Sequence, residues 1–150
     1  MRACCLDASV ALKLVLKGEP YRNRARQLLH DCLAGNIPPI APALFECEVD
    51  SVIQKRVMDG ALAAADATKA LAGLDKIPIR IVAHENLRHL ARNIAAQFHQ
   101  RTVYDSTYAA LANLYDGEYW TADKVFYDAV KADLPFVKYR HGWLFPHGLR

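Results

Sequence analysis

The sequence predicts an α/β protein built around a parallel sheet. Short apolar runs recur along the chain, and segments with helical spacing of their apolar residues separate these runs. Strands that alternate with helices are typical of parallel sheets, whose strands are covered on both faces and are therefore continuously apolar. A length of 150 residues, with 53% hydrophobic and 23% charged residues, suits a single domain over residues 1–150 with one core.

Strands are expected where the apolar runs occur. They cover residues 2–6, 77–82, 118–122 and 135–139, and the prolines make 37–42 a further extended segment that can hold a short strand. Helices are expected at 8–17, 19–35, 43–60, 61–76, 83–100, 102–117 and 123–134. Gly35 and Gly60 close two of these helices, as glycine often does. The tail, residues 140–150, has no regular period.

Charge and cysteine usage exclude some classes of protein. The formal charge of +3 permits a nucleic-acid partner but is too small to argue for one. The four cysteines contain no CxxC pair, which disfavours a zinc site or a disulfide framework and favours buried free thiols. The first apolar segment is interrupted by Asp7 and Lys13, so it is too short and too charged to span a membrane. We therefore expect a cytoplasmic protein.

Three aspartates follow predicted strands or open predicted helices. Asp7 comes directly after 2–6, Asp123 comes after the strand at 118–122, and Asp105 lies near the start of the helix at 102–117. Ligands of open parallel sheets bind beyond the carboxyl ends of the strands, which makes these three carboxylates candidates for one site. Aspartate is also a favoured helix N-cap, so capping is the alternative for each of them.

A fourth acid lies within a helix. Glu48 stands four residues from both Leu44 and Val52, so it projects from the apolar face of the helix at 43–60. Glu46 instead groups with Asp50 on the polar face, which predicts an exposed acid. A carboxylate on an apolar face needs a partner, so Glu48 is the stronger candidate and Glu46 the alternative.

Four carboxylates at one edge would repel each other unless a cation lay between them. Mg²⁺ and Mn²⁺ prefer carboxylate oxygens, and the absence of neighbouring histidines in the sequence disfavours zinc. Such a cluster suits phosphate chemistry, in which a divalent ion activates water and neutralises phosphoryl charge.

The motifs "LDASV", "ECEVDSVIQK", "TVYDSTYAALA" and "WTADKVF" occur in an order that resembles the PIN-domain nucleases. Within this family the chain is most similar to VapC-type toxins of toxin–antitoxin pairs, from Asp7 to about Val137. The resemblance implies a three-layer α/β/α, Rossmann-like sandwich with a parallel sheet of about five strands. It also implies a metal-dependent ribonuclease that uses Asp7, Glu48, Asp105 and Asp123 with one or two Mg²⁺ or Mn²⁺ ions. Ser9 and Thr121 match hydroxyl positions that support these acids, with a turn or cap role as the alternative for each.

The resemblance further implies an RNA substrate cut to 5′-phosphate and 3′-hydroxyl ends, an antitoxin partner and a homodimer. Residues 61–74 are a candidate dimer surface, with the core as the alternative. Three other functions stay open: an RNA-processing nuclease without a toxin role, a PIN-like binding module without catalysis, and a phosphoacceptor domain. The last is disfavoured because "LDAS" holds a single acid and Lys138 is poorly placed.

Basic and aromatic residues are candidates for holding RNA. The aromatic residues proposed to stack on bases are Tyr104, Tyr108 and Trp120, with the core as the alternative for Tyr108. The basic candidates for phosphate contacts are Lys13, Lys17, Arg22, Arg24, Arg26, Arg101 and Lys124. A solvated helix face is the alternative for Arg22, Arg24 and Arg26.

Overall fold

The computed structural model describes residues 3–139, and the tail expected at 140–150 lies outside them. Within these residues the chain alternates strands and helices as predicted. The strands are β1 (Cys4–Leu6), β2 (Pro39–Ala41), β3 (Arg80–Ile81), β4 (Glu118–Thr121) and β5 (Val137–Tyr139). The helices are α1 (Ala8–Val15), α2 (Arg22–Ala34), α3 (Leu44–Met58), α4 (Ala64–Lys76), α5 (Leu87–Gln97), α6 (Tyr104–Leu114) and α7 (Lys124–Val130).

All five strands are parallel and form one sheet in the order β3-β2-β1-β4-β5. The chain leaves β1 toward β2 on one side and later returns to β4 on the other, so β1 and β4 flank the point where the strand order reverses. In open α/β sheets this switch point is where ligands bind. Leu6 of β1 pairs with Trp120 of β4, so the residues that follow these two strands lie next to each other.

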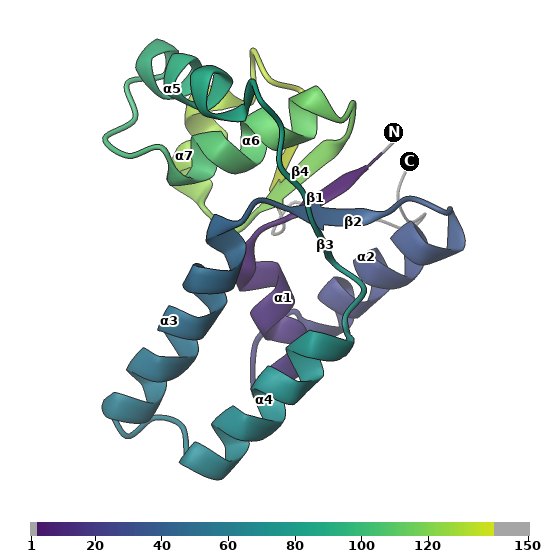
Figure 1. Cartoon of the computed structure of the whole chain (residues 1–150), viewed down its shortest axis with the longest axis vertical. Coiled ribbons are helices and arrows are strands. Elements are labelled where there is room, and N and C mark those ends of the chain that lie inside the picture. The colour runs from purple at the N-terminus through teal and green to yellow at the C-terminus, as the bar shows by residue number, and fades with distance from the viewer. Residues whose placement is uncertain (1–2, 140–150) are drawn as a thin grey trace.

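Helices cover both faces of the sheet, which makes the fold a three-layer α/β/α sandwich. Figure 1 shows α5, α6 and α7 on one side of the sheet and α1 to α4 on the other, with α3 and α4 side by side. Side chains of β1 and β4 alternate between the two layers: Cys5 and Tyr119 join the larger apolar cluster. Cys4, Leu6 and Trp120 pack with α2 in the second cluster.

The close packing of β1 against β4 requires a glycine. A Cβ atom on Gly117 would lie 2.3 Å from the carbonyl oxygen of Ala3, a backbone atom that cannot move aside. The neighbouring Glu118 N–H donates to the same oxygen at 3.1 Å. The absence of a side chain at Gly117 therefore lets α6 end and β4 begin directly beside β1.

One expectation about the cysteines is wrong. Cys4, Cys5 and Cys32 are buried free thiols, as predicted, but Cys47 is exposed. Cys47 lies on α3 beside the exposed Glu46, on the polar face of an amphipathic helix, so its position in the helical repeat decides its exposure.

Candidate active site

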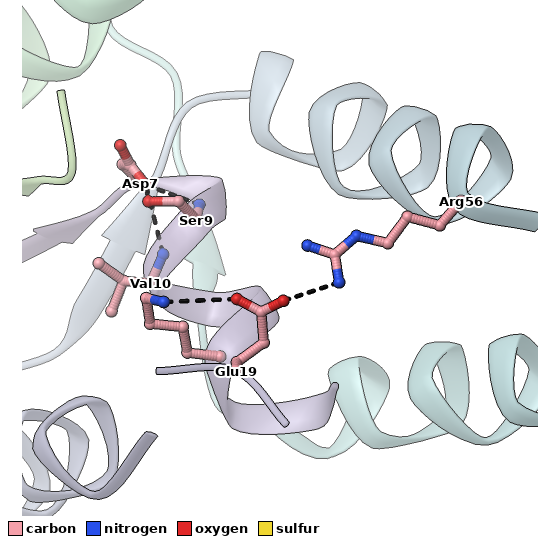
Figure 2. A network of polar contacts seen from close by, with 6 residues as sticks. Asp7, Ser9, Val10, Glu19 and Arg56 are labelled. Atoms are coloured by element: carbon pink, nitrogen blue, oxygen red, sulfur yellow. Dashed lines mark hydrogen bonds and ion pairs between the residues drawn. The ribbon is translucent and has the colours of Figure 1, made fainter. Parts of the chain in front are cut away.

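Asp7 directly follows β1 and caps α1, so the capping alternative is correct for it. Its Oδ1 accepts hydrogen bonds from Ser9 N at 2.6 Å and Val10 N at 3.3 Å, and the Ser9 hydroxyl donates to the same oxygen. Figure 2 shows this group at the first turn of α1. Oδ2 of Asp7 points toward β4, where Thr121 Oγ1 and Ala122 N each lie 3.5 Å away. Capping and membership of a site are thus compatible for this residue.

Asp123 follows β4 and caps α7. Its Oδ1 accepts from Phe126 N at 2.9 Å, and its own N–H donates to Thr121 Oγ1 at 3.0 Å. Thr121 is fully buried and its hydroxyl lies between Asp7 and Asp123. This position lets Thr121 orient both chain segments at the switch point.

Asp105 is not a helix cap. Val103 occupies the N-cap position of α6 and makes no side-chain cap hydrogen bond. Asp105 instead accepts from the hydroxyl of Tyr119 at 2.9 Å. Because Tyr119 is completely buried on β4, this bond directs the carboxylate of Asp105 back toward the sheet. The capping alternative is therefore wrong for Asp105.

Glu48 lies on the inner face of α3, and Glu46 lies on the outer face. Phe45, Val49 and Ile53 of this helix are buried, whereas Glu46 is exposed. Glu48 is half-buried and accepts from the hydroxyl of Tyr108 at 2.9 Å. The helical position thus separates the two glutamates, and only Glu48 reaches the elements that carry the other acids.

The four carboxylates influence each other electrostatically. Burial, together with the nearby charges of Asp123 and Asp7, raises the pKa of Asp105 to about 7 against the opposing hydrogen bond from Tyr119. Burial also raises the pKa of Glu48, with a contribution from Asp7, while the bond from Tyr108 lowers it. Negative charge is therefore concentrated around the switch point.

No Lys, Arg or His among residues 3–139 forms an ion pair with any of these four acids. The tyrosine and backbone hydrogen bonds of Glu48, Asp105 and Asp123 use one carboxylate oxygen each, and Asp105 and Asp123 also lie within hydrogen-bonding reach of each other. Uncompensated carboxylate oxygens of this kind fit a hard divalent cation. Among residues 3–139, no three Asp, Glu, His or Cys side chains are already arranged around one point in a way that could hold a metal ion.

Sequence reasoning did not identify the two tyrosines that hold Glu48 and Asp105. Tyr108 was expected either to stack on RNA bases or to lie in the core, and Tyr119 was expected only as part of a strand. Burial raises the pKa of both hydroxyls far above the usual tyrosine value, so both stay protonated and donate. For Tyr119, a tyrosine rather than a phenylalanine in a buried strand was the available signal, because a buried hydroxyl needs a partner.

Several predicted RNA contacts are wrong. Tyr108 and Trp120 are only 1% and 3% exposed, so neither can stack on a base, whereas Tyr104 is 60% exposed beside Asp105. Lys13 is 3% exposed, and its Nζ lies 3.4 Å from Glu19 Oε2. Figure 2 shows Glu19 also paired with Arg56 at 2.7 Å. Lys13 therefore belongs to an internal ion-pair network and is not a phosphate contact.

The remaining basic candidates differ in exposure. Arg22 is partly buried and donates to Leu14 O at 3.2 Å, and Lys124 pairs with Asp128 on α7. The exposed candidates are Lys17, Arg26, Arg101 and Lys124, while Arg24 is partly buried and stacks on Tyr21 at 5.3 Å.

The family model for the PIN domain matches residues 4–132. The chain belongs to the PIN domain family. This match includes β1 to β4 and all four acids, and no curated protein matches the chain. PIN domains are generally nucleases that act on nucleic acids, so membership indicates a hydrolase of this class. Within residues 3–139 of this PIN domain, none of the helices combines the length and apolar character needed to cross a bilayer.

Proposed function

We propose that this PIN domain is a Mg²⁺- or Mn²⁺-dependent endoribonuclease and acts as the toxin of a toxin–antitoxin pair. The observation that supports the enzyme is that Asp7, Glu48, Asp105 and Asp123 lie close enough to interact electrostatically in pairs near the switch point, without a basic ion-pair partner in the described chain. These carboxylates carry oxygen ligands of the type that both ions prefer.

The four acids would hold one or two ions, which when bound activate water for attack on phosphorus and neutralise charge on the phosphoryl oxygens. The chain contributes the positions of the ligands. The N-terminus of α1 and the Ser9 hydroxyl fix one oxygen of Asp7. Thr121 supports Asp7 and Asp123 from β4, which makes Ser9 and Thr121 supporting residues.

RNA would reach these acids at an exposed edge. Tyr104 precedes Asp105 and presents an exposed ring on which an unpaired base can stack. Arg101, which is also exposed, lies in the same approach to α6 and can contact a backbone phosphate. These features favour a single-stranded segment of RNA as the substrate.

The enzyme is tested by incubating the purified chain with RNA and Mn²⁺ and sequencing the product ends. We expect 5′-phosphate and 3′-hydroxyl ends, and a loss of about 100-fold or more in Asp105→Asn, since metal binding contributes several kcal/mol to the transition state. Glu48→Gln should lose activity comparably, whereas Glu46→Gln on the same helix should cleave like the wild type. Full activity of a folded Asp105→Asn protein would contradict the proposal.

The toxin role needs a cellular measurement. Induced expression in bacteria should arrest growth, Asp105→Asn should not, and co-expression of a small antitoxin encoded directly upstream should restore growth. An active nuclease that leaves growth unaffected would instead favour an RNA-processing enzyme.

We further propose a homodimer that involves α4, where Leu71 is exposed, although Ala67 and Ala70 of the same helix belong to the core.

A further inference from the structure

Two buried tyrosines stand behind the acids, and each contacts a different one. Tyr108 of α6 donates to Glu48 Oε1 at 2.9 Å, and Tyr119 of β4 donates to Asp105 Oδ1 at 2.9 Å. The two rings are stacked, with centroids 5.4 Å apart and an interplanar angle of 8°. The stacked pair therefore links an acid on α3 to an acid on α6 through the core.

Packing alone does not explain a hydroxyl at either position. Phenylalanine would fill nearly the same space, and burying a hydroxyl costs free energy unless it is hydrogen-bonded. Both hydroxyls are directed at carboxylates, although both rings lie in the main apolar cluster. Two independent residues on different elements thus make the same kind of contact, each to one acid of the proposed site.

The aromatic row continues to a third acid. The ring of Phe126 lies 6.2 Å from that of Tyr119 at an interplanar angle of 59°, and the Phe126 N–H donates to Asp123. Because Phe126 and Tyr119 are almost completely buried, the rings cannot move independently of the core. The row fixes the relative positions of α6, which carries Asp105, and of β4 and α7, which flank Asp123.

We propose that Tyr108 and Tyr119 are paired positioning residues of the metal site, each orienting one carboxylate while their stacked rings set the separation between Glu48 and Asp105. This inference rests on the proposed function. Each tyrosine hydroxyl contacts a single oxygen of its carboxylate. Hydrogen bonds of this kind to metal ligands fix ligand orientation and contribute to metal affinity.

The test removes only the hydroxyls, in Tyr108→Phe and Tyr119→Phe. Binding of Mn²⁺ to the full chain, measured by titration calorimetry, should be about 10- to 100-fold weaker in each variant. Tyr115→Phe is the matched control, because its hydroxyl donates to the backbone oxygen of Ala83 at 3.3 Å and not to an acid. The control should bind Mn²⁺ like the wild type.

A second measurement separates positioning from ligation and from a purely structural role. Cleavage by both Phe variants should recover toward the wild-type rate as the Mn²⁺ concentration increases, whereas Asp105→Asn should not recover. A purely structural role would lower the melting temperature in EDTA and leave Mn²⁺ affinity unchanged, and that result would overturn the inference. If one Phe variant does not fold, the other decides by the same criteria.

The results also distinguish this inference from the proposed function. Wild-type protein that neither binds Mn²⁺ nor cleaves RNA would overturn both. Wild-type binding that is lost in Asp105→Asn but unchanged in both Phe variants would overturn only the positioning role of the tyrosines.

Discussion

At the scale of single residues, the site carboxylates are held in two different ways. Asp7 and Asp123 accept from the first backbone N–H groups of α1 and α7, whereas Glu48 and Asp105 accept from tyrosine hydroxyls. An asparagine at residue 7 keeps an oxygen that can accept the capping bonds. Asp7→Asn should therefore remain folded, so a loss of activity in it reports on charge.

The raised pKa of Asp105 predicts how stability changes with pH when no metal is bound. The folded protein retains this proton up to about pH 7 while the unfolded chain loses it near 3.8, so the contribution to stability falls as pH rises through this window. Asp105→Asn cannot ionise. In EDTA, the free energy of unfolding of the variant minus that of the wild type should therefore increase by about 1–2 kcal/mol from pH 5 to pH 8, after allowing for solvent screening.

Urea unfolding of both proteins at pH 5 and pH 8 measures this difference. The raised pKa of Glu48 acts in the same direction but is common to both proteins, so it cancels in the comparison. A difference that is constant with pH would show that Asp105 is not stabilised in its protonated form.

At the scale of secondary-structure elements, α1 carries Asp7 and α3 carries Glu48, so the relation between these helices matters for the site. Glu19, which follows α1, connects them: it pairs with the buried Lys13 of α1 and with Arg56 of α3. Both cations lower the pKa of Glu19 against the effect of burial, so its carboxylate is ionised at neutral pH.

Glu19→Gln should destabilise the protein, because it removes the charge that faces the Lys13 ammonium. Solvent reaches part of Glu19, so we expect a loss of about 1–2 kcal/mol in the free energy of unfolding rather than the larger loss for fully buried pairs. Urea unfolding at pH 7 measures it. Asp128→Asn removes the exposed ion pairs with Lys124 and Lys131. This substitution should leave the urea concentration at the midpoint of unfolding unchanged. Equal effects of the two substitutions would contradict this ranking.

At the scale of the whole molecule, the strand order β3-β2-β1-β4-β5 brings together acids that are far apart in the chain. Asp7 and Asp123 meet because β1 and β4 are neighbours, and a cation between the carboxylates would connect segments from both ends of the described chain. Metal binding should therefore stabilise the entire fold and not only one loop.

Mn²⁺ at about 100 times its dissociation constant should increase the free energy of unfolding by about 2.7 kcal/mol. Thermal denaturation with Mn²⁺ and with EDTA measures this as a rise in melting temperature. The rise should be absent in a folded Asp7→Asn variant. An equal rise in the variant would place the binding of Mn²⁺ elsewhere on the protein.

The sequence by itself determined the order of the elements and the position of the acids on them. The apolar periods placed the helices and four of the strands within a few residues of the observed bounds, and the prolines of 37–42 marked the segment that holds β2. The same local geometry separated Glu48 from Glu46, because side-chain direction on a helix depends only on residue spacing. The expectation of a parallel α/β sheet followed from this alternation and is confirmed.

Only the tertiary structure decided which side chains meet. Tyr108 and Glu48 are 60 residues apart, and Tyr119 reaches Asp105 because β4 lies against α6. The burial of Trp120 and Lys13 likewise depends on which helices cover each face of the sheet. Periodicity is a property of neighbouring residues, whereas these partners depend on strand order, and no local pattern specifies that order.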